Sequence, residues 1–321
     1  MTDNIFVLGP RASGKTLFIL GLWKHILDKH SEGYINDCVV LTDDPNDDGN
    51  ELTFSDLCSN MRCGRIPERT YANKIVIYEF KGKKLGLIPV KWTFVDYAGE
   101  YCNELNESNF TRAVSILSEA LNQSPDEIRS NAGTMDFVRF IKSNHADKLH
   151  DPEFTRSVIL ATIYGNFLKA GKVILLVDGD MITDDSDDNS RLSAELGSYM
   201  KILNDLENKS KKFAVVVTKT DLVVWKNENL RYMVASMKPS GLSDIPENSK
   251  ETLAIEKSIF EILCRNPVFK NLINMIDDIS KHHFIAVSAD AKAKRLERTE
   301  DDIVPTDLVP WGFSEVFKFC S

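Results

Sequence analysis

Cysteine is scarce in this sequence, and it lacks the excess of basic charge that nucleic-acid-binding proteins carry. Its 321 residues include six cysteines without a C-x-x-C pair, and a chain of this length needs no disulfide framework. A net charge of −9 argues against nucleic acid or an anionic membrane surface as the main partner, since both need a basic face. No apolar run approaches the length of a membrane span. The first residues, MTDN, lack the features of a signal peptide, so we expect a reduced, cytoplasmic location.

The sequence also has no internal repeat and no low-complexity linker. With 43% hydrophobic residues, the chain can bury a sizeable core. Short apolar runs alternate with segments of helical periodicity, which is typical of a parallel sheet covered by helices. We therefore predict one α/β domain over residues 1–321, with a mostly parallel sheet and helices on both faces.

Two stretches depart from this simple alternation. The runs at residues 74–80 and 87–95 are joined by a turn that contains glycine, and they predict a β-hairpin at the sheet edge. Residues 101–169 have helical periodicity throughout and predict a helical insertion over about residues 101–170. A break is expected at Asp151-Pro152, where an N-cap residue precedes a proline in the first helical position.

The strongest local signal is the segment GPRASGKT at residues 9–16. It matches the phosphate-loop pattern G-x-x-x-x-G-K-[ST], between an apolar run at residues 5–8 and a segment with helical spacing. A strand–loop–helix of this kind aims several N–H groups and the positive end of a helix dipole at one point, where phosphate can bind. Lys15 is expected to reach the β- and γ-phosphates, and the Thr16 hydroxyl to bind Mg²⁺. The predicted nucleotide-binding residues of this loop are Gly9, Arg11, Ala12, Ser13, Gly14, Lys15 and Thr16.

A second motif, DYAG, begins at Asp96 and has the form D-x-x-G. Asp96 would hold Mg²⁺, usually through water, and Gly99 allows its N–H to approach the γ-phosphate. A threonine between the two motifs is also needed, one that binds Mg²⁺ when the γ-phosphate is present. The candidates are Thr70, which is best placed just before a strand, and its alternatives Thr42 and Thr53.

Two later motifs concern the base of a nucleotide. TKTD at residues 218–221 follows an apolar strand and offers the Asp221 carboxylate to the two donors on the edge of guanine. Adenine has no such donor pair, so a buried acceptor there discriminates strongly. The Lys219 stem would pack on the base. Ser288-Ala289 follows the last apolar run, where a backbone N–H would meet the guanine oxygen.

This set of motifs resembles the translation-factor and Ras-like class of P-loop GTPases, with TKTD in the place of that class's N/T-K-x-D. The resemblance spans residues 9–289 and implies GTP and GDP as ligands, Mg²⁺ as cofactor and GTP hydrolysis as the activity. Gly64, Pro67 and Thr70, followed by DYAG with Glu100 and by the long helical stretch, are similar to the double-GTPase-like domains of bacterial multi-gene systems. That narrower resemblance implies a regulatory role in a signalling or conflict system.

Two departures from Ras-like enzymes bear on the rate of hydrolysis. Glu100 stands where those enzymes carry the glutamine that orients water, and the helical insertion has no counterpart in them. Arg69 lies close to where some GTPases supply a rate-enhancing arginine, and the alternative is that it points to solvent. We expect slow turnover without a partner, and a protein effector or regulator. The predicted catalytic residues are Lys15, Arg69, Thr70, Gly99 and Glu100.

Two other functions stay open from the sequence. One is a GTP-binding scaffold with negligible hydrolysis, which the loop at residues 9–16 and Asp221 suit equally well. The other is a P-loop ATPase or kinase, which Asp221 disfavours, as does the lack of a recognisable site for an acceptor substrate.

Overall fold

The centre of the molecule is a mostly parallel sheet. The computed structural model describes residues 2–29, 36–42, 73–84, 88–183, 186–204, 211–238, 241–289, 291 and 309–321. Within this part of the chain, one seven-stranded sheet has the order β2-β3-β4-β1-β5-β6-β7. The strands are β1 (Thr2–Leu8), β2 (Asn36–Thr42), β3 (Lys74–Lys84), β4 (Ile88–Tyr97), β5 (Lys172–Asp178), β6 (Lys212–Thr218) and β7 (His283–Ala286).

Only β3 runs against its neighbours among the strands described. It pairs antiparallel with β2 and β4, whereas β4, β1, β5, β6 and β7 are mutually parallel. The predicted α/β class with a mostly parallel sheet is therefore confirmed. β1 has β4 on one side and β5 on the other, so the order of the strands reverses there. Open parallel sheets bind ligands in the crevice beyond the carboxyl ends of the strands at such a point.

Helices cover both faces of the sheet. They are α1 (Lys15–Lys29), α3 (Glu107–Leu121), α4 (Pro125–Asn131), α5 (Met135–Asn144), α6 (Pro152–Lys169), α7 (Ser186–Asn204), α8 (Thr220–Lys226), α9 (Glu228–Met237), α10 (Lys250–Leu263), α11 (Pro267–Ile279) and α12 (Phe313–Cys320). Short 3-10 helices are η1 (Gly99–Asn103), η2 (Ala146–His150), η3 (Gly179–Met181) and η4 (Leu242–Asp244). Among the described helices, none combines the length and the apolarity needed to cross a bilayer.

Alternate residues of the central strands enter two separate hydrophobic layers. Phe6 and Leu8 of β1 pack into the larger layer, with α6, α7 and α11. Ile5 and Val7 pack into the smaller layer, with α1 and α12. A strand with both faces covered must be apolar along its whole length, which is why β1, β5 and β6 read as unbroken apolar runs. The prediction of helices on both faces is confirmed.

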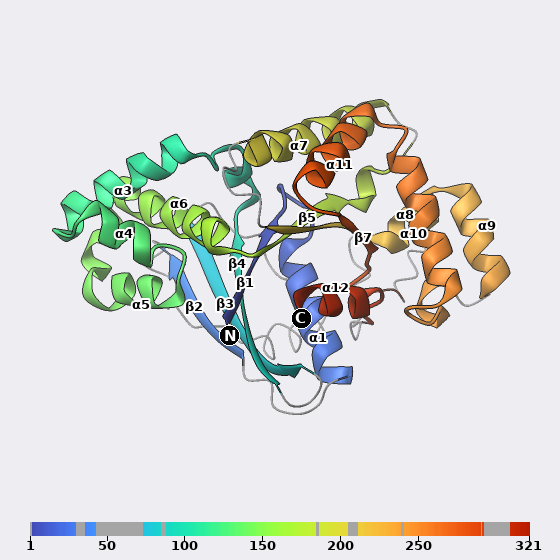
Figure 1. Cartoon of the computed structure of the whole chain (residues 1–321), viewed down its shortest axis with the longest axis horizontal. Helices are drawn as coiled ribbons and strands as arrows, with labels where there is room; N and C mark the ends of the chain where they lie inside the picture. Colours follow the sequence, from blue (N-terminus) through green and yellow to red (C-terminus); the bar gives the residue numbers. More distant parts are fainter. Residues whose placement is uncertain are drawn as a thin grey trace, which may run out of the picture.

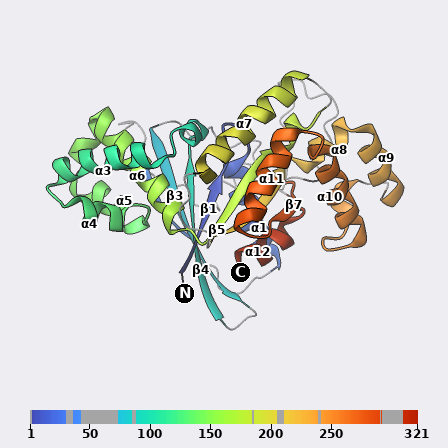
Figure 2. The ribbon, with the colours of Figure 1, turned by 45° about the horizontal axis from the view of Figure 1, so that its top comes forward.

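Residues 101–169 are mostly helical, as predicted, and their helices gather at one end of the molecule. Figures 1 and 2 show α3, α4, α5 and α6 together at this end, and α8, α9 and α10 at the opposite end. Local caps set the helix boundaries. Asp151 accepts hydrogen bonds from the N–H groups of Glu153 and Phe154, and Pro152 occupies the first turn of α6.

The predicted hairpin is present as β3 and β4, but it is not the edge of the sheet. β2 pairs with the outer side of β3 along its whole length, from Asn36 opposite Phe80 to Thr42 opposite Lys74. Val39 and Leu41 of β2 pack into the larger hydrophobic layer, and Val40 packs into the smaller one. Burial of both faces therefore places this short apolar segment in the sheet, outside the hairpin.

Candidate functional site

The loop at residues 9–16, hereafter the glycine-rich loop, joins β1 to α1 at the carboxyl edge of the sheet. Ala12 and Gly14 both have left-handed backbone conformations, with φ of 66° and 81°. The backbone N–H and the hydroxyl of Ser13 both donate to the carbonyl of Pro10, which closes a tight turn. Turns with left-handed residues form concavities of backbone N–H groups that bind anions. Alanine adopts this conformation only with strain, and such strain is concentrated at functional sites.

The two predicted metal ligands with described positions lie side by side. The Thr16 hydroxyl donates to Oδ2 of Asp96 at 2.6 Å, and Asp96 is buried at the end of β4. Among the residues described, no group of three or more His, Cys, Asp or Glu side chains is arranged to hold a metal ion. Mg²⁺ in phosphate sites needs only one or two protein oxygen ligands beside those of the substrate. Thr16 and Asp96 therefore fit Mg²⁺ bound together with a nucleotide.

Lys15 is folded back over its own loop. Its Nζ donates to the carbonyls of Gly9 at 2.7 Å and Pro10 at 3.2 Å, and it lies 5.1 Å from the centre of the Tyr97 ring. A Cβ atom placed at Gly9 would stand 2.4 Å from the Ser13 hydroxyl oxygen and 2.9 Å from Cγ of Lys15, so a larger residue there would displace both side chains. The ammonium group thus lies at the loop itself, held by neutral acceptors that a phosphate oxygen would outcompete.

The D-x-x-G motif touches the glycine-rich loop directly. A Cβ atom placed at Gly99 would lie 2.1 Å from the backbone nitrogen of Arg11 and 2.3 Å from the carbonyl carbon of Pro10. Glycine is therefore the only residue that η1 can begin with in this position. Glu100 follows in the first turn of η1 and is half-buried, whereas the Arg11 side chain is exposed.

TKTD links several of the predicted motifs. The Thr218 hydroxyl donates to the carbonyl of Ser13 in the glycine-rich loop at 2.9 Å. The Thr220 hydroxyl and backbone N–H both donate to the carbonyl of Val287, which directly precedes Ser288, at 2.9 and 3.1 Å. Both threonines are buried, so these bonds fix the tetrapeptide between β1 and β7.

The two residues predicted to recognise guanine are also brought together. The Ser288 hydroxyl donates to Oδ1 of Asp221 at 2.7 Å, and Asp221 lies in the first turn of α8. Ser288 is held in turn by a two-way backbone pair with Trp311, at 3.0 and 2.9 Å. Ala289 packs against the hydrophobic layer that contains α1 and α12.

Two acidic residues at the site were not predicted as site residues. Asp178, at the end of β5, forms an ion pair with Lys219, whose Nζ lies 2.7 Å from Oδ2. Its Oδ1 accepts a 2.9 Å hydrogen bond from the N–H of Asp180. Glu195 of α7 lies in the same electrostatic environment, where burial and the Asp178 carboxylate raise its pKa to about 7. The acid that ends β5 was visible in the sequence, but its pairing depends on tertiary structure.

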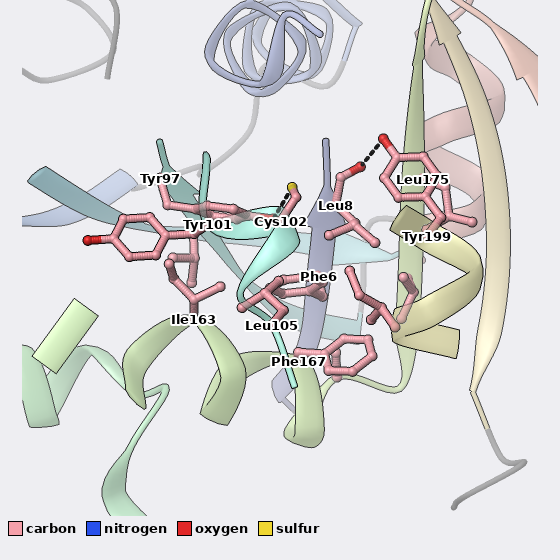
Figure 3. Packing of buried hydrophobic residues seen from close by; sticks show 14 of the residues in the cluster. Phe6, Leu8, Tyr97, Tyr101, Cys102, Leu105, Ile163, Phe167, Leu175 and Tyr199 are labelled. Atoms are coloured by element: carbon pink, nitrogen blue, oxygen red, sulfur yellow. Dashed lines mark hydrogen bonds between the residues drawn. The ribbon is translucent and has the colours of Figure 1, made fainter. Parts of the chain in front are cut away.

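Buried polar side chains contact the glycine-rich loop and the end of β1 from η1 and α7. The Tyr199 hydroxyl of α7 donates to the carbonyl of Leu176 at 2.5 Å and lies 3.4 Å from the carbonyl of Leu8, the last residue of β1 (Figure 3). The Cys102 thiol donates to the carbonyl of Gly9 at 3.1 Å. The Tyr97 hydroxyl donates to Val7 at 3.3 Å. Burial raises the pKa of the Cys102 thiol, so the thiol stays protonated and can donate. These contacts tie η1 and α7 to the same loop.

Three predicted residues lie outside the described part of the chain. They are Thr53, Arg69 and Thr70. Thr42 is described as the last residue of β2 and lies at the same edge of the sheet as Asp96, but two strands away from β4. The identity of the metal-binding threonine and the role of Arg69 stay predictions.

No protein-family model matches this chain, and no curated protein matches its sequence. The functional interpretation therefore depends on the residues and contacts described above.

Proposed function

We propose that this chain binds GTP and GDP with Mg²⁺, hydrolyses GTP, and works as a nucleotide-dependent molecular switch. The observation that carries the proposal is the position of TKTD. Thr218 is bonded to Ser13 of the glycine-rich loop, and Asp221 is bonded to Ser288. One tetrapeptide thus joins a site suited to phosphate to a site suited to a base, which is the layout that a nucleotide requires.

Base selection would depend on the Asp221 carboxylate. It can accept from both the N1–H and the exocyclic amine of guanine, whereas adenine presents no such pair of donors. The bond from Ser288 orients this carboxylate, and the paired backbone of Trp311 holds Ser288 in place. Adenine at the same place would cover the half-buried Asp221 carboxylate without offering it donors, which is the costly outcome for binding.

Phosphate binding would depend on the glycine-rich loop. Lys15 would exchange its bonds to the carbonyls of Gly9 and Pro10 for charged phosphate oxygens, which are stronger acceptors. The N-terminus of α1 adds its dipole. Thr16 and Asp96 would hold Mg²⁺, which neutralises charge on the phosphates when it is bound.

The switch itself would be η1. Gly99 packs on the loop at Arg11, so a γ-phosphate beside this loop would change the contacts of Gly99 first. η1 is connected to two larger elements. Asn103 accepts a 2.8 Å hydrogen bond from Ser198 of α7, and Glu104, just after η1, forms a 2.5 Å ion pair with Arg156 of α6. A change at Gly99 would therefore reach the helices that we expect to bind a protein partner.

Hydrolysis is expected to be slow in the isolated chain. Glu100 is an anion near dense negative charge, so it would orient water less well than a neutral amide. Arg69 is proposed to stabilise the charge of the transition state. Thr70 is proposed to supply the second hydroxyl that binds the metal. A partner or self-assembly would raise the rate.

Single-turnover hydrolysis tests the proposal. With Mg²⁺ and excess protein, we expect radiolabelled GTP to be converted to GDP and ATP to be left intact. Lys15→Met keeps the aliphatic stem of Lys15, so it should abolish turnover while the circular-dichroism spectrum stays that of the parent. Equal rates with ATP and GTP would contradict guanine selectivity. GTP binding without hydrolysis above the solution rate would contradict the enzymatic part and leave a GTP-binding scaffold.

A further inference from the structure

The Lys219 side chain crosses from the end of one strand to the end of the next. Its backbone follows β6, and its Nζ lies 2.7 Å from Oδ2 of Asp178 at the end of β5. Adjacent strands are about 4.8 Å apart, a gap that the four-carbon stem of a lysine can span. The stem therefore lies along the carboxyl edge of the sheet, between these two strands. Ser288, which binds Asp221, follows β7 on the far side of β6 from Asp178.

Lys219 is also constrained through its backbone. It has φ of 53° and ψ of 40°, a left-handed conformation that is unfavourable for a residue with a side chain. It is the N-cap of α8, which begins at Thr220 and carries Asp221 in its first turn. The position of Lys219 is therefore fixed by the same short segment that carries Asp221.

Asp178 is built to hold this contact. Its side chain is 3% exposed, whereas that of Lys219 is 29% exposed. A buried carboxylate needs partners for both oxygens. Oδ1 accepts from the N–H of Asp180, so Oδ2 has Lys219 as its charged partner. The side chains of Glu195 and Lys15 act on the same region electrostatically, and burial raises the pKa of Glu195.

We propose that Asp178 is a positioning residue for nucleotide binding, which holds the Lys219 stem in advance across the place where the purine ring would stack. This inference rests on the proposed function. Asp178 does not touch the base; it acts through Lys219. Fixing a long side chain before binding removes the entropy that the ligand would otherwise have to pay for, so the effect falls on the affinity for the base.

Asp178→Asn is the direct test, because the amide keeps an oxygen for the N–H of Asp180 and removes the charge that holds Lys219. The matched control is Asp180→Asn, since the Asp180 side chain pairs with Lys226 at 2.9 Å and its replacement leaves the Asp178 carboxylate in place. GDP affinity is measured by displacement of a fluorescent GDP analogue, with pyrophosphate as a second competitor that lacks the base. Asp178→Asn should weaken GDP about tenfold, the loss expected from one unfixed long side chain. The affinity of Asp178→Asn for pyrophosphate should change by no more than about twofold. Asp180→Asn should change the affinity for GDP and for pyrophosphate by no more than about twofold.

A double-mutant cycle separates the contact from a general loss of structure. Lys219→Met removes the ion pair between Lys219 and Asp178. Adding Asp178→Asn to this variant should therefore change its GDP affinity by no more than about twofold. Equal weakening of GDP and pyrophosphate, or GDP affinity of Asp178→Asn equal to that of Asp180→Asn, would overturn the inference while the proposed function stands. If the parent chain does not bind GDP, the proposed function fails and the inference fails with it.

Discussion

At the scale of single residues, Asp221 is where nucleotide selectivity can be changed most cleanly. Its carboxylate is bonded to Ser288 and stands at the start of α8. Asp221→Asn replaces one acceptor oxygen by a donor, so guanine loses a charged hydrogen bond and xanthine, with a carbonyl in place of the amine, gains a partner. GDP affinity should fall about tenfold or more. Xanthosine diphosphate should bind the variant better than the parent. Calorimetric titration of both nucleotides measures the two effects, and unchanged selectivity would remove Asp221 from base recognition.

Gly99 provides a steric test that does not depend on a ligand. A Cβ atom there would stand 2.1 Å from the backbone nitrogen of Arg11, so Gly99→Ala must push η1 away from the glycine-rich loop. We expect a loss of about 1–3 kcal/mol in the free energy of unfolding. Gly197→Ala in α7 is the matched control, because a Cβ atom there meets no atom within 4 Å. It should stabilise the protein by about 1 kcal/mol. Urea denaturation distinguishes the two, and a neutral Gly99→Ala would show that η1 does not pack on the loop.

Glu195 gives a pH dependence with a defined sign. Burial, followed by the Asp178 carboxylate, raises its pKa from 4.5 to about 7. Between these values the folded chain binds more protons than the unfolded chain, so stability falls as pH rises through this window. Glu195→Gln removes this contribution. The difference in stability between pH 5.5 and pH 8 should be smaller in the variant, although burial also raises the pKa of Glu256 to about 7 in both proteins. Identical pH profiles of the urea midpoint would show that Glu195 is solvated.

At the scale of elements, α6 is the partner of η1 that a regulator could use. Arg156 of α6 pairs with Glu104 at 2.5 Å and lies 6.0 Å from the centre of the Tyr101 ring. The Arg156 side chain is 58% exposed, so this pair adds little to overall stability. We propose instead that the Arg156–Glu104 pair transmits a change at the candidate site to the helices α3, α4, α5 and α6.

Hydrogen exchange measures this coupling. Protection of α6 should differ between the GDP state and the state with a GTP analogue, and Arg156→Met should reduce this difference without lowering nucleotide affinity. Arg112→Met is the control, because Arg112 of α3 also forms an exposed ion pair with α6, through Glu153 at 3.4 Å. Equal protection of α6 in both nucleotide states of the parent would assign these helices a passive structural role.

The sequence predicted some elements far better than others. The start of α6 was recognisable because an N-cap residue, Asp151, precedes a proline in the first turn. α8 and α9 were missed, since α8 has only seven residues and Asn227 separates it from α9. The edge position of β2 was missed because strand pairing is decided by long-range packing that a local pattern does not contain.

At the scale of the whole molecule, the candidate site follows from one property of parallel strands. β1, β4, β5, β6 and β7 all end at the same edge, so motifs spread over most of the chain meet there. Sequence reasoning could therefore predict that Thr16, Asp96, Asp221 and Ser288 lie together. It could not predict the ion pair of Asp178, because that depends on which strands are neighbours in space.

The central claim is that this edge of the sheet binds a guanine nucleotide. Calorimetric titration of the parent chain with GDP and with ADP, in the presence of Mg²⁺, tests it most directly, with Lys15→Met as the control for phosphate binding. The account predicts that GDP binds, that ADP binds at least about a hundredfold more weakly, and that Lys15→Met weakens GDP. Equal affinity for GDP and ADP, or no binding of either, would contradict it.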